Sequence, residues 1–172
     1  TPRTAGFNTT DLASFSETGQ MLIILLMLIG GSPGSTAGGM KTTTIAVLVS
    51  SALSVFRKKE NTHIFKRRIP ENTVKSAATI FLMYIVLFIG GGMIISRLEN
   101  IPLLPSLFET ASAIGTVGLS LGITSQLGIV SQFILIILMF FGRVGGLTLI
   151  FAAMTKTATN AAKYPQEKIT VG

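Results

Sequence analysis

Three apolar stretches, each long enough to cross a lipid bilayer as a helix, dominate this chain of 172 residues. They cover roughly residues 16–56, 74–98 and 126–155. A bilayer core is about 30 Å thick, and a helix needs about 20 apolar residues to span it. Only 12% of the residues are charged, whereas soluble domains carry about 25%. The sequence therefore predicts an all-α membrane protein.

The charged residues are concentrated in the segment RKKENTHIFKRR, residues 57–68, which holds six Lys or Arg and one Glu. Between two membrane spans such a segment is typical of a short cytoplasmic loop, and a contact with anionic lipid or a regulator is the alternative. We expect residues 57–70 and the tail, residues 158–172, to be cytoplasmic, and no nucleic-acid partner. With no cysteine and one histidine, His63, the chain lacks thiolate metal sites and most histidine-based ones.

The first apolar stretch is interrupted by GGSPGSTAGGMK, residues 30–41, which holds five glycines, a proline and three hydroxyl side chains. This composition cannot form a stable helix, and broken backbone is tolerated at membrane depth only where protein or water satisfies it. We predict a mobile gate lining a water-filled cavity, with a kink or a close helix-packing surface as the alternative. Lys41 is expected to anchor the end of this loop to a carboxylate or to backbone carbonyls. The predicted gate residues are Gly30, Gly31, Ser32, Pro33, Gly34, Ser35, Thr36, Ala37, Gly38, Gly39 and Lys41.

The segment PLLPSLFETASAIGTVGLSLG, residues 102–122, is too short and too polar to cross the bilayer. Pro105 suits the first turn of a helix, SLFETASAI continues it, and TVGLS ends it. A short helix followed by a Gly-bearing extended segment between two spans is the pattern of a re-entrant pore loop. Glu109 is expected to hold this helix or the following segment by hydrogen bonds rather than to bind an ion.

Part of this pattern occurs twice. Thr4-Ala5-Gly6-Phe7 parallels Thr116-Val117-Gly118-Leu119, and AGGMKT at residues 37–42 parallels VGGLTL at residues 144–149. Two markers in the same order indicate an internal repeat. We expect the C-terminal part of a longer chain, in which residues 1–56 end one helix–pore loop–helix unit and residues 71–157 form the next.

Carbonyl oxygens of a narrow extended segment can replace the hydration shell of K⁺, and glycine allows the positive φ that such a segment needs. Asn8 and Ser120 stand where the second glycine of the K⁺-channel sequence TVGYG would lie, so we expect fewer well-formed ion sites. The predicted filter residues are Thr4, Ala5, Gly6, Thr116, Val117 and Gly118.

Arg143 lies within the third apolar stretch, in FFGRVGG. A charge at this depth costs at least about 2.5–3.5 kcal/mol, so it should face a pore or a partner. In a cation pathway it would raise a barrier, and a salt bridge to an acidic group on another repeat is the alternative. Gly90, Gly91 and Gly92 are expected to serve helix packing or, alternatively, a hinge.

The segments TPRTAGFNT, GGSPGSTAGGMKT, SAIGTVGLS, FGRVGGLT and YPQEKITVG resemble the Trk/Ktr/HKT cation transporters, most of all the membrane subunit of the bacterial Ktr potassium uptake system. The resemblance covers nearly the whole chain. It implies the last two of four repeated helix–pore loop–helix units around a K⁺-channel-like pore in the plasma membrane. It further implies the loop at residues 30–41 as a gate and Arg143 as a barrier.

The same resemblance implies a homodimer, activation by Na⁺, and a cytosolic ring of KtrA-type regulatory subunits that bind ATP or ADP. This chain carries neither a GxGxxG motif after a strand nor a P-loop, so we expect no nucleotide on it. It has no nucleophile motif, histidine cluster or paired carboxylates within a span, which argues against an enzyme. We predict K⁺ uptake, with a Na⁺ or mixed-cation transporter of the same architecture, or a purely structural membrane partner, as alternatives.

Overall fold

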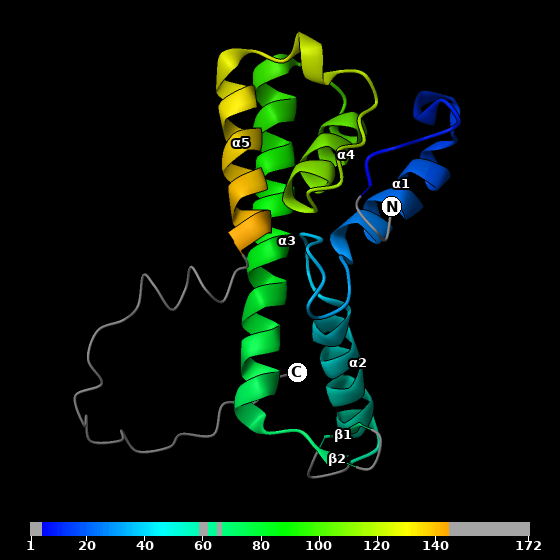
Figure 1. Ribbon diagram of the computed structural model, residues 1–172. Helices are drawn as coiled ribbons and strands as arrows, with labels where there is room; N and C mark the ends of the chain where they lie inside the picture. Colours follow the sequence, from blue (N-terminus) through cyan, green and yellow to red (C-terminus); the bar gives the residue numbers. More distant parts are fainter. Residues whose placement is uncertain (1–4, 59–61, 65–66, 145–172) are drawn as a thin grey trace, which may run out of the picture.

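The computed structural model describes residues 5–58, 62–64 and 67–144. Within these residues the chain forms five α-helices and one short antiparallel strand pair, and it is elongated along its longest helix (Figure 1). The helices are α1 Glu17–Leu28, α2 Thr42–Phe56, α3 Glu71–Glu99, α4 Leu103–Ile114 and α5 Ile129–Val144, and the strands are β1 His63–Ile64 and β2 Arg67–Arg68.

Helix α3 is the one described helix long and apolar enough to cross a membrane by length and composition. Its 29 residues would extend about 44 Å at 1.5 Å per residue. The helix includes the whole of the expected span, residues 74–98, and is a few residues longer at its N-terminal end. Asn100 ends the helix in the left-handed conformation, with φ of 53°, as is common at a helix C-terminus. Large apolar side chains on its outer face are exposed, namely Phe81, Leu82, Val86, Ile89, Met93 and Ile94.

The first apolar stretch is divided between α1 and α2, as its sequence predicted. Ser16 caps α1, because its Oγ accepts a hydrogen bond from the N–H of Gly19 at 3.3 Å. The two helices, of 12 and 15 residues, are each too short to span a bilayer alone. They follow one another along the long axis of the molecule, with the glycine-rich segment between them (Figure 1).

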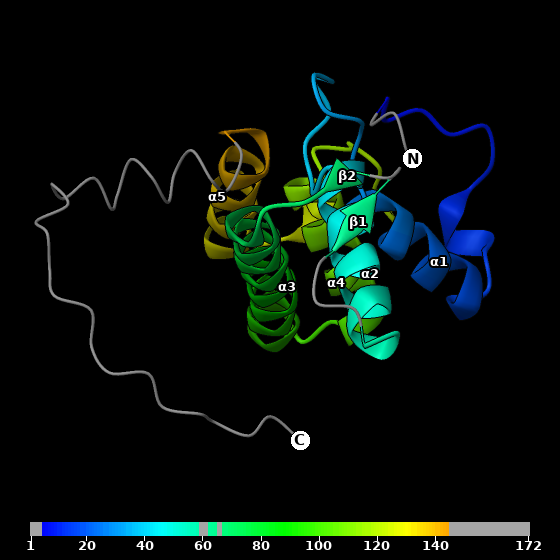
Figure 2. The ribbon, with the colours of Figure 1, turned by 90° about the horizontal axis from the view of Figure 1, so that it is seen from below.

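Helix α4 lies in the middle of the bundle, packed against α1, α3 and α5 (Figure 2). Phe108 and Ile114 are completely buried there, together with Ile24 of α1 and Ile95 of α3. The helix begins at Leu103, so Pro105 is its third residue, where the missing N–H has no intrahelical partner to lose.

Two glycines of α3 allow α4 and α5 to approach closely. A Cβ built on Gly92 would lie 2.5 Å from Cδ2 of Leu107, and one on Gly91 would lie 3.0 Å from Cδ1 of Leu138 of α5. A Cβ on Gly90 would meet open space. The packing role expected of this glycine run is therefore confirmed for Gly91 and Gly92.

The basic segment contains a feature that its sequence did not predict. His63 pairs with Arg68, and Ile64 pairs with Arg67, in the short β1–β2 ladder. The Oγ of Ser54 lies 3.2 Å from Oγ1 of Thr62, which ties the segment to α2. The β1–β2 pair lies between the end of α2 and the start of α3, at the opposite end of the molecule from the α4–α5 connection (Figure 1).

Candidate functional site

The second Thr-x-Gly segment, residues 116–119, leaves the end of α4 in an unusual backbone conformation. Thr116 and Gly118 have φ of 51° and 83°, while Val117 between them does not have a positive φ. In a regular strand successive residues point to opposite sides, whereas alternating φ signs allow successive carbonyls to point to the same side. The turn is held by Val117 N–H, which donates to the carbonyl of Ser112 at 2.9 Å.

Gly6 of the first Thr-x-Gly segment lies directly beside the second segment. A Cβ on Gly6 would lie 2.9 Å from the carbonyl oxygen of Val117 and 3.6 Å from Cα of Gly118. Gly6 also has a positive φ, of 73°, so both segments have this conformation at the matching glycine. Ala5 is exposed, and Thr4 lies outside the described residues.

Glu109 of α4 holds the far end of the second segment. Its Oε1 accepts hydrogen bonds from Ser120 Oγ at 2.6 Å and from Leu121 N–H at 3.1 Å. Its Oε2 accepts from Thr124 Oγ1 at 2.8 Å. Only 4% of the residue is exposed, so the carboxylate depends on these donors, and Glu109 has the hydrogen-bonding role that we expected of it.

The glycine-rich loop, residues 30–41, is a closed loop rather than a distorted helix. Its two ends are joined by a parallel bridge between Ile29 and Met40. Gly30 N–H donates to the carbonyl of Met40 at 2.7 Å, and Met40 N–H donates to that of Leu28 at 3.1 Å. Gly30 allows this approach, because a Cβ there would overlap the carbonyl of Gly38.

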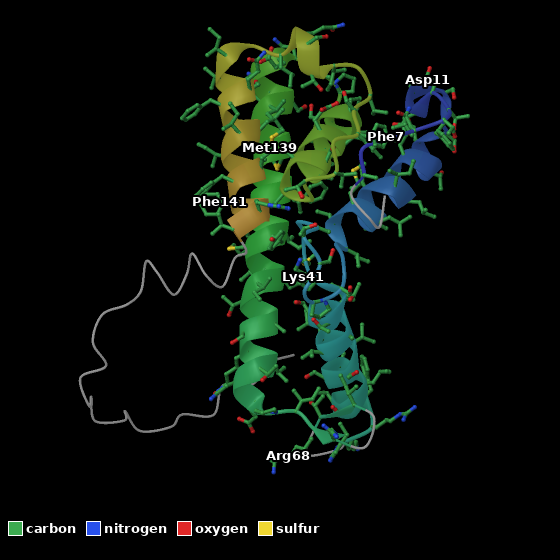
Figure 3. All side chains as sticks on the ribbon, in the orientation of Figure 1. Phe7, Asp11, Lys41, Arg68, Met139 and Phe141 are labelled. Atoms are coloured by element: carbon green, nitrogen blue, oxygen red, sulfur yellow. The ribbon has the colours of Figure 1, made fainter. Side chains whose placement is uncertain are left out.

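Lys41 draws the loop back on itself. Its Nζ donates to the carbonyl of Ser35 at 3.0 Å and to that of Ala37 at 2.6 Å. Of the two anchors expected for this lysine, the structure shows backbone carbonyls. Figure 3 shows Lys41 on the loop between α1 and α2, beyond the end of α4.

The loop contacts the second Thr-x-Gly segment and the last turn of α5. Gly38 N–H donates to Oγ1 of Thr116 at 3.0 Å. A Cβ on Gly38 would overlap that hydroxyl, so glycine is required for the contact. The guanidinium of Arg143 donates to the carbonyl of Thr36. Arg143 therefore faces the loop and not an apolar neighbour.

A groove of about 780 Å³ opens between α4 and α5 and joins these features. Polar side chains and backbone line it near the Thr-x-Gly segment, and apolar side chains of α5 line the opposite wall. We call it the α4–α5 groove, and its lining is Thr36, Glu109, Ser112, Ala113, Thr116, Gly118, Leu119, Ser120, Thr124, Leu135, Met139, Phe140 and Arg143.

Sequence reasoning named the loop, the two glycines and Arg143, and the structure brings the described ones together. It did not name Ser112, Leu135, Met139 or Phe140, which line the groove. No local signal marks them, since each occupies an ordinary helical position whose role depends on how α4 and α5 pack. VGGLTL, the second marker of the repeat, lies almost entirely outside the described residues.

Comparison with known proteins identifies the family to which this chain belongs. Residues 1–163 match the family described as TrkH, cation transport protein. This chain belongs to the TrkH family. It is 38% identical, over its whole length, to Ktr system potassium uptake protein B of Bacillus subtilis (strain 168). It is 39% identical to the potassium/sodium uptake protein NtpJ of Enterococcus hirae, again over the whole chain.

A solved structure has the same fold. The potassium transporter TrkH from Vibrio parahaemolyticus superimposes with a TM-score of 0.73 and 24% sequence identity, covering 90% of this chain and 35% of that one. This chain spans 38% of the length of the B. subtilis relative and 40% of the length of the E. hirae relative. The expected resemblance and the helical fold are thus confirmed. The expectation that the chain is not an enzyme is also confirmed, since these relatives are transport proteins.

Proposed function

We propose that this chain forms part of a K⁺ uptake protein and supplies two of the segments that line its ion pathway. The observation that carries the proposal is the position of Gly6 directly beside Gly118, both with positive φ. Backbone in this conformation can present a series of carbonyl oxygens to a dehydrated K⁺. The names of the relatives support the same conclusion, since that from B. subtilis is a potassium uptake protein and that from E. hirae a potassium/sodium uptake protein.

In this proposal the filter carbonyls come from Thr4, Ala5 and Gly6 of one unit and from Thr116, Val117 and Gly118 of the next. Two further units, in the part of the protein outside this sequence, would complete the ring. Glu109 holds the outer end of the second segment, so that its carbonyls keep their spacing when no ion is bound. K⁺ passes as cargo, with no covalent step and no nucleotide on this chain.

The glycine-rich loop acts as the gate, and Arg143 acts as an electrostatic barrier. The loop lies against Thr116, at the start of the second Thr-x-Gly segment, through the Gly38 hydrogen bond. Arg143 holds the loop through Thr36 and adds a fixed positive charge beside the groove, which opposes an approaching cation. Opening requires the loop to leave Thr116 and the guanidinium to leave Thr36.

The chain lies in the plasma membrane, with residues 57–70 and 158–172 on the cytoplasmic side. Asp11 and Arg68 lie at opposite ends of the molecule (Figure 3), which supports an outer and an inner end. Residues 1–56 and 71–157 then belong to two successive units. The concentration of cations in residues 57–68 supports this orientation.

The proposal includes a homodimer, with activation by Na⁺ and control by a cytosolic KtrA-type ring that binds ATP or ADP. The name of the B. subtilis relative refers to a Ktr system, which supports a multi-component assembly. The exposed apolar side chains of α3 can contact membrane lipids.

A Na⁺ or mixed-cation transporter is the second candidate, because the E. hirae relative is described as a potassium/sodium uptake protein. Both candidates use the same pathway and differ in how the filter discriminates between the two ions.

Rubidium uptake into liposomes that contain the full-length protein tests the gate and barrier. Arg143→Ala should raise uptake severalfold, because it removes both the positive charge and the Thr36 hydrogen bond. Deletion within residues 32–37 should likewise leave the pathway leaky. Arg97→Ala, an exposed arginine in the last turn of α3, is the matched control and should change little. Unchanged or lower uptake by folded Arg143→Ala protein contradicts the barrier, and a deletion that closes the pathway contradicts the gate.

A further inference from the structure

Three consecutive peptide oxygens of the glycine-rich loop hold side-chain cations. The carbonyls of Ser35 and Ala37 accept from Lys41 Nζ at 3.0 and 2.6 Å. The carbonyl between them, of Thr36, accepts from Arg143. Both cations are therefore held by uncharged peptide dipoles, whose oxygens carry partial negative charge.

The local fold of the loop makes these oxygens converge. Gly34 has φ of 84°, and Ser35 N–H donates to the carbonyl of Ser32 at 3.0 Å, which closes a tight turn. Ser35 Oγ then accepts from Ala37 N–H at 3.2 Å. The chain doubles back, so that the carbonyls of Ser35 and Ala37 both reach the half-buried Lys41, the residue that precedes α2.

Convergent carbonyl oxygens are also the means by which proteins replace the water around K⁺. A primary ammonium ion has the same charge as K⁺ and a similar size, and it is bound by similar sets of oxygens. The pair of contacts to Lys41 thus has the chemistry of a monovalent-cation site, in which the bound cation is attached to the chain.

We propose that the carbonyls of Ser35 and Ala37 form a monovalent-cation site, and that its occupation by the Lys41 ammonium keeps the loop against Thr116. The inference rests on the gate role in the proposed function, and it names what holds the gate closed. When the ammonium leaves, the two carbonyls lose their common partner and the loop loses the contact that draws residues 35–37 toward Lys41. A free primary ammonium ion, which offers the same N–H donors, can then take its place.

Chemical rescue in the full-length protein tests the inference. Lys41→Ala removes the three terminal carbons and the ammonium while the carbonyls remain. Rubidium uptake by this variant should rise severalfold, and propylammonium should return it toward the wild-type rate. Tetramethylammonium has the same charge but no N–H donor, so it should have no effect. Lys58→Ala, an exposed lysine just beyond α2, is the matched control and should leave uptake unchanged.

Arg143→Ala retains Lys41 and separates rescue from simple blocking of the pathway by the amine. Its raised uptake should not respond to propylammonium. If propylammonium slows both variants equally, or if the leak of Lys41→Ala does not respond to it, the cation site is wrong, although the proposed ion pathway can still stand.

A second readout does not depend on ion flux. Only 6% of Ala37 is exposed, and the described chain has no cysteine, so Ala37→Cys reports when the loop leaves its position. In a background without other cysteines, adding Lys41→Ala should raise the rate of thiol labelling severalfold, and propylammonium should lower it again. A labelling rate that changes with neither Lys41→Ala nor propylammonium overturns the cation site. If the labelling rate changes as predicted but the wild-type protein takes up no K⁺, the proposed function is wrong instead.

Discussion

The backbone N–H of Gly38 donates a hydrogen bond of 3.0 Å to Oγ1 of Thr116, which lies 78 positions away in the chain. This bond joins the glycine-rich loop to the second Thr-x-Gly segment. Because the hydroxyl accepts from the loop, the Thr116 side chain and the loop occupy the same end of that segment. The proposed gate and the proposed filter are therefore in direct contact.

Gly38→Ala should open the pathway. A Cβ at this position would overlap Oγ1 of Thr116, and it would lie 2.7 Å from Cγ2 of Thr116 and 3.0 Å from the carbonyl of Gly115. The loop must move away to accommodate it, and the Gly38 hydrogen bond is lost. We expect severalfold faster rubidium uptake into liposomes containing the full-length protein.

Gly34→Ala is the matched control for that variant. It also lies in the loop and has φ of 84°, yet a Cβ there would meet nothing within 4 Å. It introduces the strain of a left-handed alanine, of order 1 kcal/mol, without displacing the loop from Thr116. Equal uptake by the two variants would show that general strain in the loop, and not the Thr116 contact, controls opening.

Glu109→Gln should weaken ion selection while uptake persists. An amide has one acceptor oxygen where the carboxylate has two, and three donors from residues 120–124 depend on this carboxylate. A hydrogen bond to a charged group contributes about 1.5–3 kcal/mol, and its loss loosens the outer end of the second Thr-x-Gly segment. The expected result is a lower ratio of K⁺ to Na⁺ permeability, measured from reversal potentials.

Glu99→Gln provides the comparison. Glu99 accepts from Gly128 N–H at 2.9 Å and from Ser131 Oγ at 2.5 Å, and so holds the start of α5 at the end of α3. Both donors reach the same oxygen, Oε1, and the amide oxygen of glutamine can still accept from both. Glu99→Gln should therefore leave the permeability ratio unchanged. A permeability ratio that falls equally in both variants would contradict the specific role of Glu109.

Gly142→Ala should destabilise the bundle. A Cβ there would overlap the carbonyl oxygen of Ile114, and it would lie 2.8 Å from the carbonyl carbon. Backbone atoms cannot rotate aside, so α4 and α5 must separate, at a cost typical of overpacking, about 1–3 kcal/mol. Thermal unfolding of the purified full-length protein measures this. Gly90→Ala, with open space around it, should keep the wild-type stability or raise it by up to about 1 kcal/mol, because alanine favours a helix over glycine; similar losses in both variants would contradict the packing argument.

Much of the fold could be predicted from local patterns. The uncharged run within α3, residues 76–96, is long enough to specify a helix by itself. The proline and glycines of residues 30–41 exclude a helix whatever surrounds them. The Thr-x-Gly pair was recognised because two short motifs recur in the same order. The first two signals each lie within a few tens of residues, and the third needs only a comparison of short motifs, so composition and spacing are sufficient to find them.

Contacts between distant segments could not be predicted in this way. Nothing near Gly38 indicates that it meets Thr116, and nothing near Arg143 names Thr36 as its acceptor. Lys41 had two possible kinds of anchor, and only the folded loop distinguishes them. The β1–β2 pair was missed because two-residue strands are too short to show alternation between polar and apolar positions.

The central claim is that backbone oxygens near Gly6 and Gly118 select the transported ion. The variant Gly118→Ser tests this claim most directly. Gly118 has φ of 83°, which a serine adopts at a cost, so the carbonyls on either side should shift while the bundle stays folded. The measurement is the ratio of K⁺ to Na⁺ permeability of the full-length protein, from reversal potentials in planar bilayers. We predict a fall of about tenfold, equivalent to about 1.4 kcal/mol of lost discrimination. An unchanged ratio in folded, K⁺-conducting Gly118→Ser protein would contradict the account.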